Sequence, residues 1–226
     1  MKQFLILVAI CGMATLCLAD TTIIQKVESG PMMGQPGTKA IQTMRIKGTK
    51  ARIDHDNVAQ YQIMDLEAKK VYTVDNDKKQ AMVMSLDMMN AAGAMFKQMN
   101  KDAKLNVQST GNNRTVNGFK CTDYVISMTG AMAMTSKQCL TKDIDSSDFE
   151  AFKPYAEGMV KMFLGDNTTQ LPEGMAVVTE TNMTMMGQKI DSKTELQSVK
   201  KEPIDGSIFE IPAGHKVQEM PGVPKQ

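Results

Sequence analysis

Clusters of turn-forming residues recur along this chain and divide it into short β-prone runs. The clusters read "GQPG", "KGTK", "DHDN", "DNDKK", "STGNN" and "MMGQ". Gly, Pro, Asn and Asp favour turns because they tolerate unusual backbone angles or hydrogen-bond to the nearby backbone. The runs between the clusters predict strands over residues 21–28, 38–47, 50–55, 59–65, 70–75, 79–84, 104–110, 119–128, 132–141, 175–185 and 188–200. Consecutive hairpins of this kind indicate an antiparallel meander rather than alternating strands and helices.

Two segments instead have the spacing of amphipathic helices. Residues 85–104 place apolar side chains at helical intervals, and Ser85 is in position to cap the first turn. Residues 146–166 repeat this spacing, and Pro154 is expected to start a new turn or to kink the helix. Because a large open sheet must curl, we predict an α+β fold, a half-open (unclosed) antiparallel β-barrel of about eleven strands with two helices covering the concave side.

The N-terminal segment has the pattern of a secretory signal peptide. A basic start at Lys2, an apolar run and a small residue, Ala19, are typical of such segments. We therefore expect residues 1–19 to be a signal peptide and residues 20–226 to form a single domain. The mature protein is expected to be periplasmic or secreted. No later run reaches the roughly 18 apolar residues that a span needs, so no transmembrane segment is expected after signal removal.

The charges of the mature chain balance. The whole sequence has 26 Lys and Arg against 25 Asp and Glu, and loss of Lys2 makes the numbers equal. A neutral chain gives no electrostatic reason to bind nucleic acid or an anionic membrane. Nucleic acid is therefore not an expected partner.

Two cysteines remain after the signal peptide, and they lie in one predicted hairpin. An even number of cysteines in an oxidising compartment predicts a disulfide between Cys121 and Cys139. A hairpin that is symmetric about Gly130 would place these two residues directly opposite each other, and would place Asp123 opposite Lys137. The opposite face of the same hairpin is expected to be the core or cavity side.

The sequence contains no recognisable catalytic motif. It has no Gly-x-Ser-x-Gly elbow, no phosphate loop and no His-Glu-x-x-His. The acidic clusters "DHDN" and "DNDKK" do not continue into a calcium-binding loop and are better explained as turns. We therefore expect no enzyme activity, no catalytic residues, no metal site and no cofactor.

Four stretches, taken in order, resemble a known group of bacterial exported proteins. They are "GTKARIDHD", "IMDLEAKKVYTVDNDKKQAMVM", "VNGFKCTDYVI" and "DGSIFEIPAGHKV". The group is the outer-membrane lipoprotein carrier (LolA/LolB-like) superfamily, in a branch known only as a domain of unknown function. The resemblance implies an unclosed antiparallel barrel with a helical lid and a hydrophobic cavity. It also implies carriage of lipidic ligands across the periplasm, although the carrier's tryptophans and lid-locking arginine have no match here.

The 22 methionines suggest how such a cavity would be lined. Methionine is unbranched and polarizable, and therefore adapts to acyl chains. We expect binding or carriage of a hydrophobic small molecule or lipid, with an envelope protein as a further candidate partner. The expected cavity residues are Met82, Met84, Met88, Met95, Met99, Tyr124, Ile126, Met128, Met132, Met134, Phe149, Phe152, Met159 and Phe163.

Two other interpretations of the methionines remain open. The pairs Met82/Met84, Met132/Met134 and Met183/Met185 each place two sulfurs on one strand face, as a periplasmic copper-binding protein would need. The third interpretation is a structural or assembly factor of the cell envelope.

Overall fold

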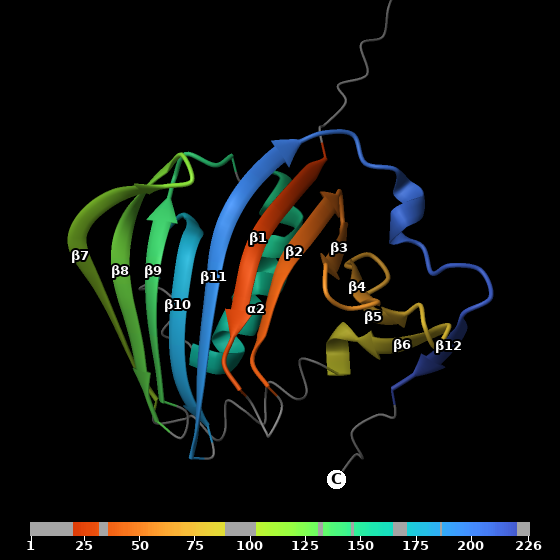
Figure 1. Ribbon diagram of the computed structural model, residues 1–226, viewed down its shortest axis with the longest axis horizontal. Helices are drawn as coiled ribbons and strands as arrows, with labels where there is room; N and C mark the ends of the chain where they lie inside the picture. Colours follow the sequence, from red (N-terminus) through yellow and green to blue (C-terminus); the bar gives the residue numbers. More distant parts are fainter. Residues whose placement is uncertain are drawn as a thin grey trace, which may run out of the picture.

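A single curved sheet forms the body of the molecule (Figure 1). The computed structural model describes residues 20–31, 36–88, 103–130, 133–145, 147–164, 171–185 and 187–220, without the side chains of 148, 159–164 and 185. Among the described residues, twelve strands follow the order β12-β6-β5-β4-β3-β2-β1-β11-β10-β9-β8-β7. Neighbouring strands are antiparallel except for β12 and β6, which are parallel. The predicted half-open antiparallel architecture is therefore confirmed.

The strand boundaries agree closely with those expected from the turn clusters. The strands are β1 (Thr21–Ser29), β2 (Thr38–Lys47), β3 (Lys50–His55), β4 (Gln60–Asp65), β5 (Lys70–Asp75), β6 (Gln80–Ser85), β7 (Lys104–Val116), β8 (Phe119–Thr129), β9 (Ala133–Thr141), β10 (Met175–Met185), β11 (Gln188–Lys201) and β12 (Lys216–Glu219). Two differences stand out. The turn clusters do not predict β12, and β7 continues past the turn cluster "STGNN" because a register shift between Ser109 and Asn113 absorbs it as a bulge.

The second predicted helix has two parts. A 3-10 helix, η1 (Ser147–Phe152), leads directly into α2 (Lys153–Leu164). The change falls beside Pro154, which fits a first helical turn because it lacks an N–H donor. Within the parts of the chain that the structure describes, no helix is long and apolar enough to cross a bilayer.

The first predicted helix is described only at its start. The Ser85 hydroxyl accepts a hydrogen bond of 3.2 Å from the backbone N–H of Met88, as expected of an N-cap. Residues 89–102 lie outside the described residues.

The larger core packs against the face of the sheet that α2 covers. Figure 1 places α2 behind β1 and β2. Ile23, Ile46 and Leu196 are buried on this face and belong to one cluster, against which Phe149 and Phe152 of η1 pack. The side of the sheet with α2 is called the concave face below, and the other side is called the convex face.

A second core lies on the convex face of β4, β5 and β6. The C-terminal segment 202–215 crosses this region before β12 joins β6 (Figure 1). Its buried apolar residues pack on apolar side chains of the three strands. The cluster contains Tyr61, Ile63, Val74, Ala81, Ile204 and Phe209. The C-terminal segment therefore removes from water a patch of convex face that would otherwise be exposed.

The predicted disulfide is present, but the predicted hairpin register is wrong. The Cys121 and Cys139 sulfurs are 2.07 Å apart. Asp123 pairs with Cys139, and Val125 rather than Asp123 pairs with Lys137. β8 ends at Thr129 and β9 begins at Ala133, so the hairpin is centred one residue later than Gly130. This shift changes each partner by two residues and leaves every side chain on its predicted face, so the cysteines bridge diagonally.

The tip of the β7–β8 hairpin folds across its neighbours. Asn117, in the turn, donates from Nδ2 to the Leu196 carbonyl at 2.8 Å and to Glu195 Oε1 at 3.0 Å. β9 and β10 separate β8 from β11 in the sheet. The turn must therefore lie over the convex face, where Val116 and Phe119 belong to the apolar surroundings of the disulfide.

Candidate ligand-binding face

Two cross-strand rows make the concave face of β2 to β6 apolar and rich in methionine. Residues that pair across strands share a face, so the registers assign each row directly. The first row is Ile46, Ala51, Met64, Val71 and Met84. The second row is Ile23, Met44, Ile53, Gln62, Thr73 and Met82. The first row is mostly buried, whereas Met82 in the second is 43% exposed.

Two further rows give the concave face of β8 to β2 a different character. One row is Tyr124, Gln138, Thr179, Thr194, Val27 and Ala40. The other is Ile126, Ser136, Thr181, Ser192, Ser29 and Thr38. Gln138 Nε2 donates to Ser136 Oγ at 3.2 Å, and the Ser136 and Thr181 hydroxyls are 3.1 Å apart. Hydroxyls and amides therefore form a connected polar band on this part of the face.

None of the described residues in these four rows carries a formal charge at neutral pH. In the part of the chain that the structure describes, the charged side chains of this face lie at its ends. Lys142 pairs with Glu173 at 3.2 Å, and Lys201 lies 3.9 Å from Asp145. Asp75 lies at the opposite side of the sheet, where it ends β5. The centre of the concave face is thus polar or apolar but uncharged.

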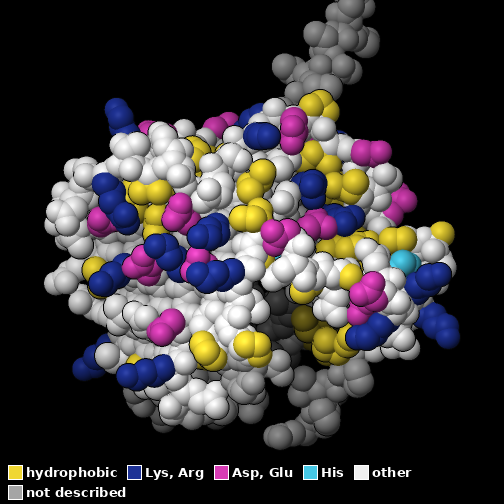
Figure 2. Space-filling view, in the orientation of Figure 1, with side chains coloured by type: hydrophobic (Ala, Val, Ile, Leu, Met, Phe, Trp, Pro, Cys, Tyr) yellow, Lys and Arg dark blue, Asp and Glu magenta, His cyan; other side chains and the backbone are white. Residues whose placement is uncertain are grey.

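The same strands carry alternating charges on the convex face. Figure 2 shows Lys and Arg beside Asp and Glu across the strands on this side. The ion pairs include Lys26–Glu28 at 2.9 Å, Arg114–Asp123 at 3.0 Å and Lys193–Glu180 at 3.0 Å. Hydrogen bonds with Glu28 raise the pKa of Lys26, and those from Lys26 and Lys39 lower the pKa of Glu28. The convex face of these strands therefore carries solvent-exposed ion pairs, in which opposite charges neutralise each other.

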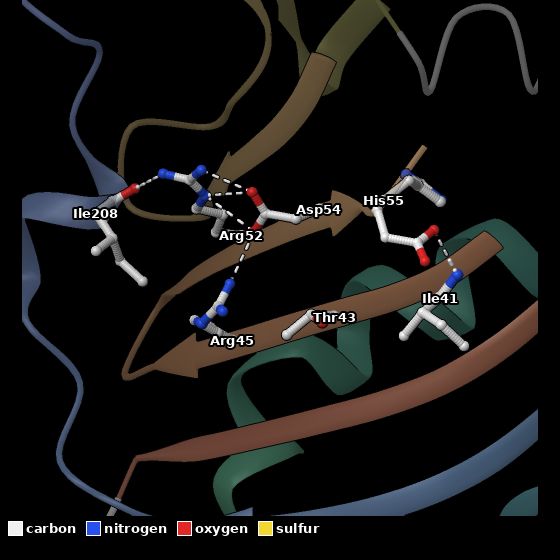
Figure 3. Close-up of a pocket in the computed structure, with 8 residues that line it drawn as sticks. Ile41, Thr43, Arg45, Arg52, Asp54, His55 and Ile208 are labelled. Atoms are coloured by element: carbon white, nitrogen blue, oxygen red, sulfur yellow. Dashed lines mark hydrogen bonds and ion pairs between the residues drawn. The ribbon is translucent and has the colours of Figure 1, made fainter. Parts of the chain in front are cut away.

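A cleft of about 410 Å³ on the convex face separates β2 and β3 from the C-terminal segment (Figure 3). Arg45 and Arg52 both bind Asp54, with nitrogen–oxygen distances of 2.9 Å and 2.6 Å. Arg52 also donates to the Ile208 carbonyl at 3.0 Å and lies 3.7 Å from the centre of the Tyr61 ring. The cations are thus already engaged, and the arrangement attaches the C-terminal segment to the sheet.

The predicted cavity residues fall into several groups. Met82 and Met84 lie on β6, whereas Tyr124, Ile126, Met128 and Met134 lie on β8 and β9, far along the strand order. Phe149 and Phe152 pack on the main core, and Met88 is partly buried just after β6. Met159 and Phe163 belong to α2, but their side chains are not described. Met95, Met99 and Met132 lie outside the described residues.

The sequence-based prediction missed part of this face. Met44 and Met64 lie in the apolar rows, and Ser136, Gln138 and Thr181 form the polar band. A usable signal exists in β11, where Asp191, Lys193 and Glu195 alternate with uncharged residues. Strict alternation of charged with uncharged polar residues predicts two faces of different chemistry.

One geometric observation supports the copper-binding interpretation of the methionines. Met128, Met134 and Met183 pair directly with one another across β8, β9 and β10, so that three thioethers share one concave row. In the predicted pairs Met132/Met134 and Met183/Met185, Met132 and the side chain of Met185 lie outside the described part of the structure. Among the described residues, no group of three or more His, Cys, Asp or Glu side chains could hold a metal ion.

Comparison with known proteins places the chain in a family. The family described as Domain of unknown function (DUF4412) matches residues 32–215, and no curated protein matches. This match confirms the expected branch known only as a domain of unknown function, and a LolA superfamily protein is among the solved structures that the chain resembles.

Several solved structures resemble the chain in their overall course. An uncharacterized conserved protein from Thermus thermophilus has a TM-score of 0.48 and 7% identity, covering 90% of this chain and 92% of that one. A LolA superfamily protein from Nitrosomonas europaea has a TM-score of 0.35 and 10% identity, with coverages of 86% and 91%. A DUF1329 family protein from Desulfovibrio piger has a TM-score of 0.37 and 9% identity, with coverages of 86% and 90%.

Proposed function

The chain belongs to the DUF4412 family of domains of unknown function, and we propose that it binds a hydrophobic ligand, a lipid or an acyl chain, without catalysis. The observation that carries this proposal is the uncharged, methionine-rich concave face. The convex face of the same strands is covered with charges. A sheet face that only contacted water would be expected to carry charges in the same way.

Burial of apolar surface would supply the affinity. Met44, Met64 and Met84 are only partly buried, and Met82 is more exposed. Covering such side chains yields about 25 cal/mol per Å² of apolar area before the costs of ordering ligand and protein. Methionine suits this task because its flexible side chain can fit acyl chains of different shape.

The setting of this activity is part of the proposal. The N-terminal pattern that ends at Ala19 favours export, and the disulfide fits an oxidising compartment. A carrier in the periplasm, or a secreted one, would receive its ligand from one envelope component and deliver it to another. An envelope protein is therefore the expected partner.

Native mass spectrometry of the protein purified from its own host tests the proposal. The expected result is a fraction of molecules with a bound lipid that organic extraction removes. A protein that carries no lipid, and that takes up no fluorescent fatty-acid analogue when one is added, would overturn the proposal.

A matched pair of variants tests the location of the ligand. Met82 and Val217 are both exposed, at 43% and 55%, on neighbouring strands. Met82 lies on the concave face, whereas Val217 pairs with Ala81 of the convex core and therefore shares the convex face. Met82→Glu should weaken uptake of the fatty-acid analogue at least fivefold, and Val217→Glu should leave it unchanged. Equal effects of the two variants would contradict the placement of the ligand on the concave face.

Soft-metal binding is the second candidate, supported by the row of Met128, Met134 and Met183. Thioether sulfur is a preferred ligand of Cu(I). Anaerobic titration with Cu(I) against a competing chelator tests this candidate. Met134→Leu should abolish binding, while the control Met64→Leu, outside the row, should not. No binding by the unaltered protein would exclude the candidate.

A further inference from the structure

The polar band of the concave face has a chemistry that the apolar rows do not explain. Ser136, Gln138 and Thr181 are joined by hydrogen bonds, and Thr179 and Thr194 continue the band onto β10 and β11. We propose that this band recognises the head group of the ligand, and that the preferred ligand is an amphiphile with an uncharged, hydroxyl-bearing head group. This inference rests on the proposed function and adds the class of ligand to it.

The absence of charge from the band decides the class of head group. A phosphate, carboxylate or ammonium group that leaves water needs an opposite charge or several hydrogen bonds of fixed direction. Among the described residues of the two polar rows, no Lys, Arg, Asp or Glu is present to compensate such a charge. Hydroxyl and amide groups both donate and accept, so they match a neutral polyol without a charge penalty.

The band and the apolar rows are placed so that one molecule can contact both. Thr194 of the band lies on β11 and shares its row with Ala40 of β2, which is four residues from Met44 along the same strand. Two steps of about 4.8 Å across the strands and four residues of about 3.3 Å along them give a separation of roughly 16 Å. A head group on the band therefore leaves an attached acyl chain within reach of the methionine rows.

The convex face shows that the band is a property of one side and not of these strands in general. Glu180 and Lys193 are sequence neighbours of Thr179, Thr181 and Thr194, yet they form an ion pair of 3.0 Å on the other face. Figure 2 shows that charged side chains are frequent on that face. Charge is thus accommodated on β10 and β11 wherever the side chain points away from the concave side.

Three probes that share a myristoyl chain test the inference by calorimetry below their critical micelle concentrations. The first is 1-monomyristoylglycerol, whose head group is a neutral diol. The other two are anions, myristate and myristoyl lysophosphatidylglycerol. We expect the monoglyceride to bind at least tenfold more tightly than either anion at pH 8. Equal affinities for all three would overturn the head-group inference and leave the proposed function standing. Failure of all three to bind would overturn the proposed function itself.

Two variants then locate the head group. Thr181→Val keeps the shape of the side chain and removes its hydroxyl, and should weaken monoglyceride binding roughly fivefold to tenfold, which is typical of one lost hydrogen bond. Gln138→Glu introduces a negative charge into the band, and should weaken myristate further while improving binding of a cationic myristoyl amphiphile. Thr43→Val, at the convex cleft, is the control and should bind the monoglyceride as the unaltered protein does.

Thermal unfolding of each variant is measured first, so that lost binding is not confused with lost folding. A Thr181→Val protein that folds and still binds the monoglyceride with unchanged affinity would exclude the band as the head-group site. A Gln138→Glu protein with an unchanged order of preference would lead to the same conclusion.

Discussion

The two faces of the sheet are built from the same strands but differ in chemistry. In β11, Glu195 lies on the convex face and binds Asn117 and Gln197, while its neighbour Leu196 is fully buried on the concave face. Hydrogen bonds from Asn117 and Gln197 lower the pKa of Glu195, so this carboxylate stays ionised at the surface. Whether a position in these strands carries a charge therefore depends on the face to which its side chain points, and not on the segment of chain in which it lies.

The largest effect is expected when a charge is placed on the concave face. Leu196→Asp puts a carboxylate where the native side chain is 0% exposed. We expect a loss of about 4 kcal/mol or more in unfolding free energy, because an unpaired charge is buried. Urea denaturation followed by circular dichroism measures this loss. Glu195→Gln, one residue away on the convex face, is the control and should cost about 1 kcal/mol or less; equal losses would contradict the assignment of faces.

The disulfide on the convex face is expected to contribute the next largest effect. The double variant Cys121→Ala, Cys139→Ala removes a link between residues 18 apart in sequence. We expect a loss of about 3 kcal/mol, chiefly because the unfolded chain gains conformational freedom. The same denaturation experiment gives the value. If adding a reductant destabilised the double variant as much as the unaltered protein, the loss would not come from this bond.

The hairpin tip should contribute less. Asn117 has a positive φ of 49°, so Asn117→Gly keeps the backbone conformation while removing both side-chain hydrogen bonds to β11. The expected loss is about 1–2 kcal/mol, since the buried Leu196 carbonyl loses a donor. Hydrogen exchange at residues 116–119 should increase at the same time. Unchanged exchange there would mean that the turn is held by its apolar contacts alone.

The smallest expected effect comes from Asp75, a charge at the edge of the concave side. Hydrogen bonds from the Lys78 backbone and from Gln60 lower its pKa from 3.8 to about 2. A carboxyl whose pKa is lower in the folded state stabilises the fold above its unfolded pKa, and this contribution is lost as the pH falls from about 4 to 2. Asp75→Asn should therefore flatten the decline of the melting temperature over that interval. A decline as steep as in the unaltered protein would assign the acid sensitivity to other carboxyls.

Local sequence patterns are sufficient for most strands because each hairpin is bounded by turn residues and alternates with period two. Pairing details need the structure. The predicted Cys121–Cys139 hairpin is centred one residue early, since a centre at Gly130 and a centre at the next residue keep the same side chains on each face. β12 escapes prediction because four residues beside "PAGH" give little periodic signal, and because its parallel partner, β6, lies far away in sequence.

The candidate site is less predictable for a different reason. Met64 and Val71 become neighbours, and Met44 joins them on the same face, only through the registers of successive strands, and no spacing in the chain indicates this directly. The polar band poses the same problem, since Ser136 and Thr181 are 45 residues apart in sequence. What the sequence does contain is the alternation of charged and uncharged residues along β11, which marks the two faces once the strands are known.

The position of β1 has a consequence for how the protein is made. β1 is the first strand of the described residues, yet it lies between β2 and β11, and Asp20 just before it accepts a hydrogen bond from the backbone N–H of Ile204. Because a ribosome delivers the N-terminus first, β1 can pair with β2 early, but its other side must wait until nearly the whole polypeptide has been synthesised. A nascent chain therefore exposes an unpaired strand edge for most of its synthesis, and during that time it is open to pairing with a second copy or to protection by a chaperone.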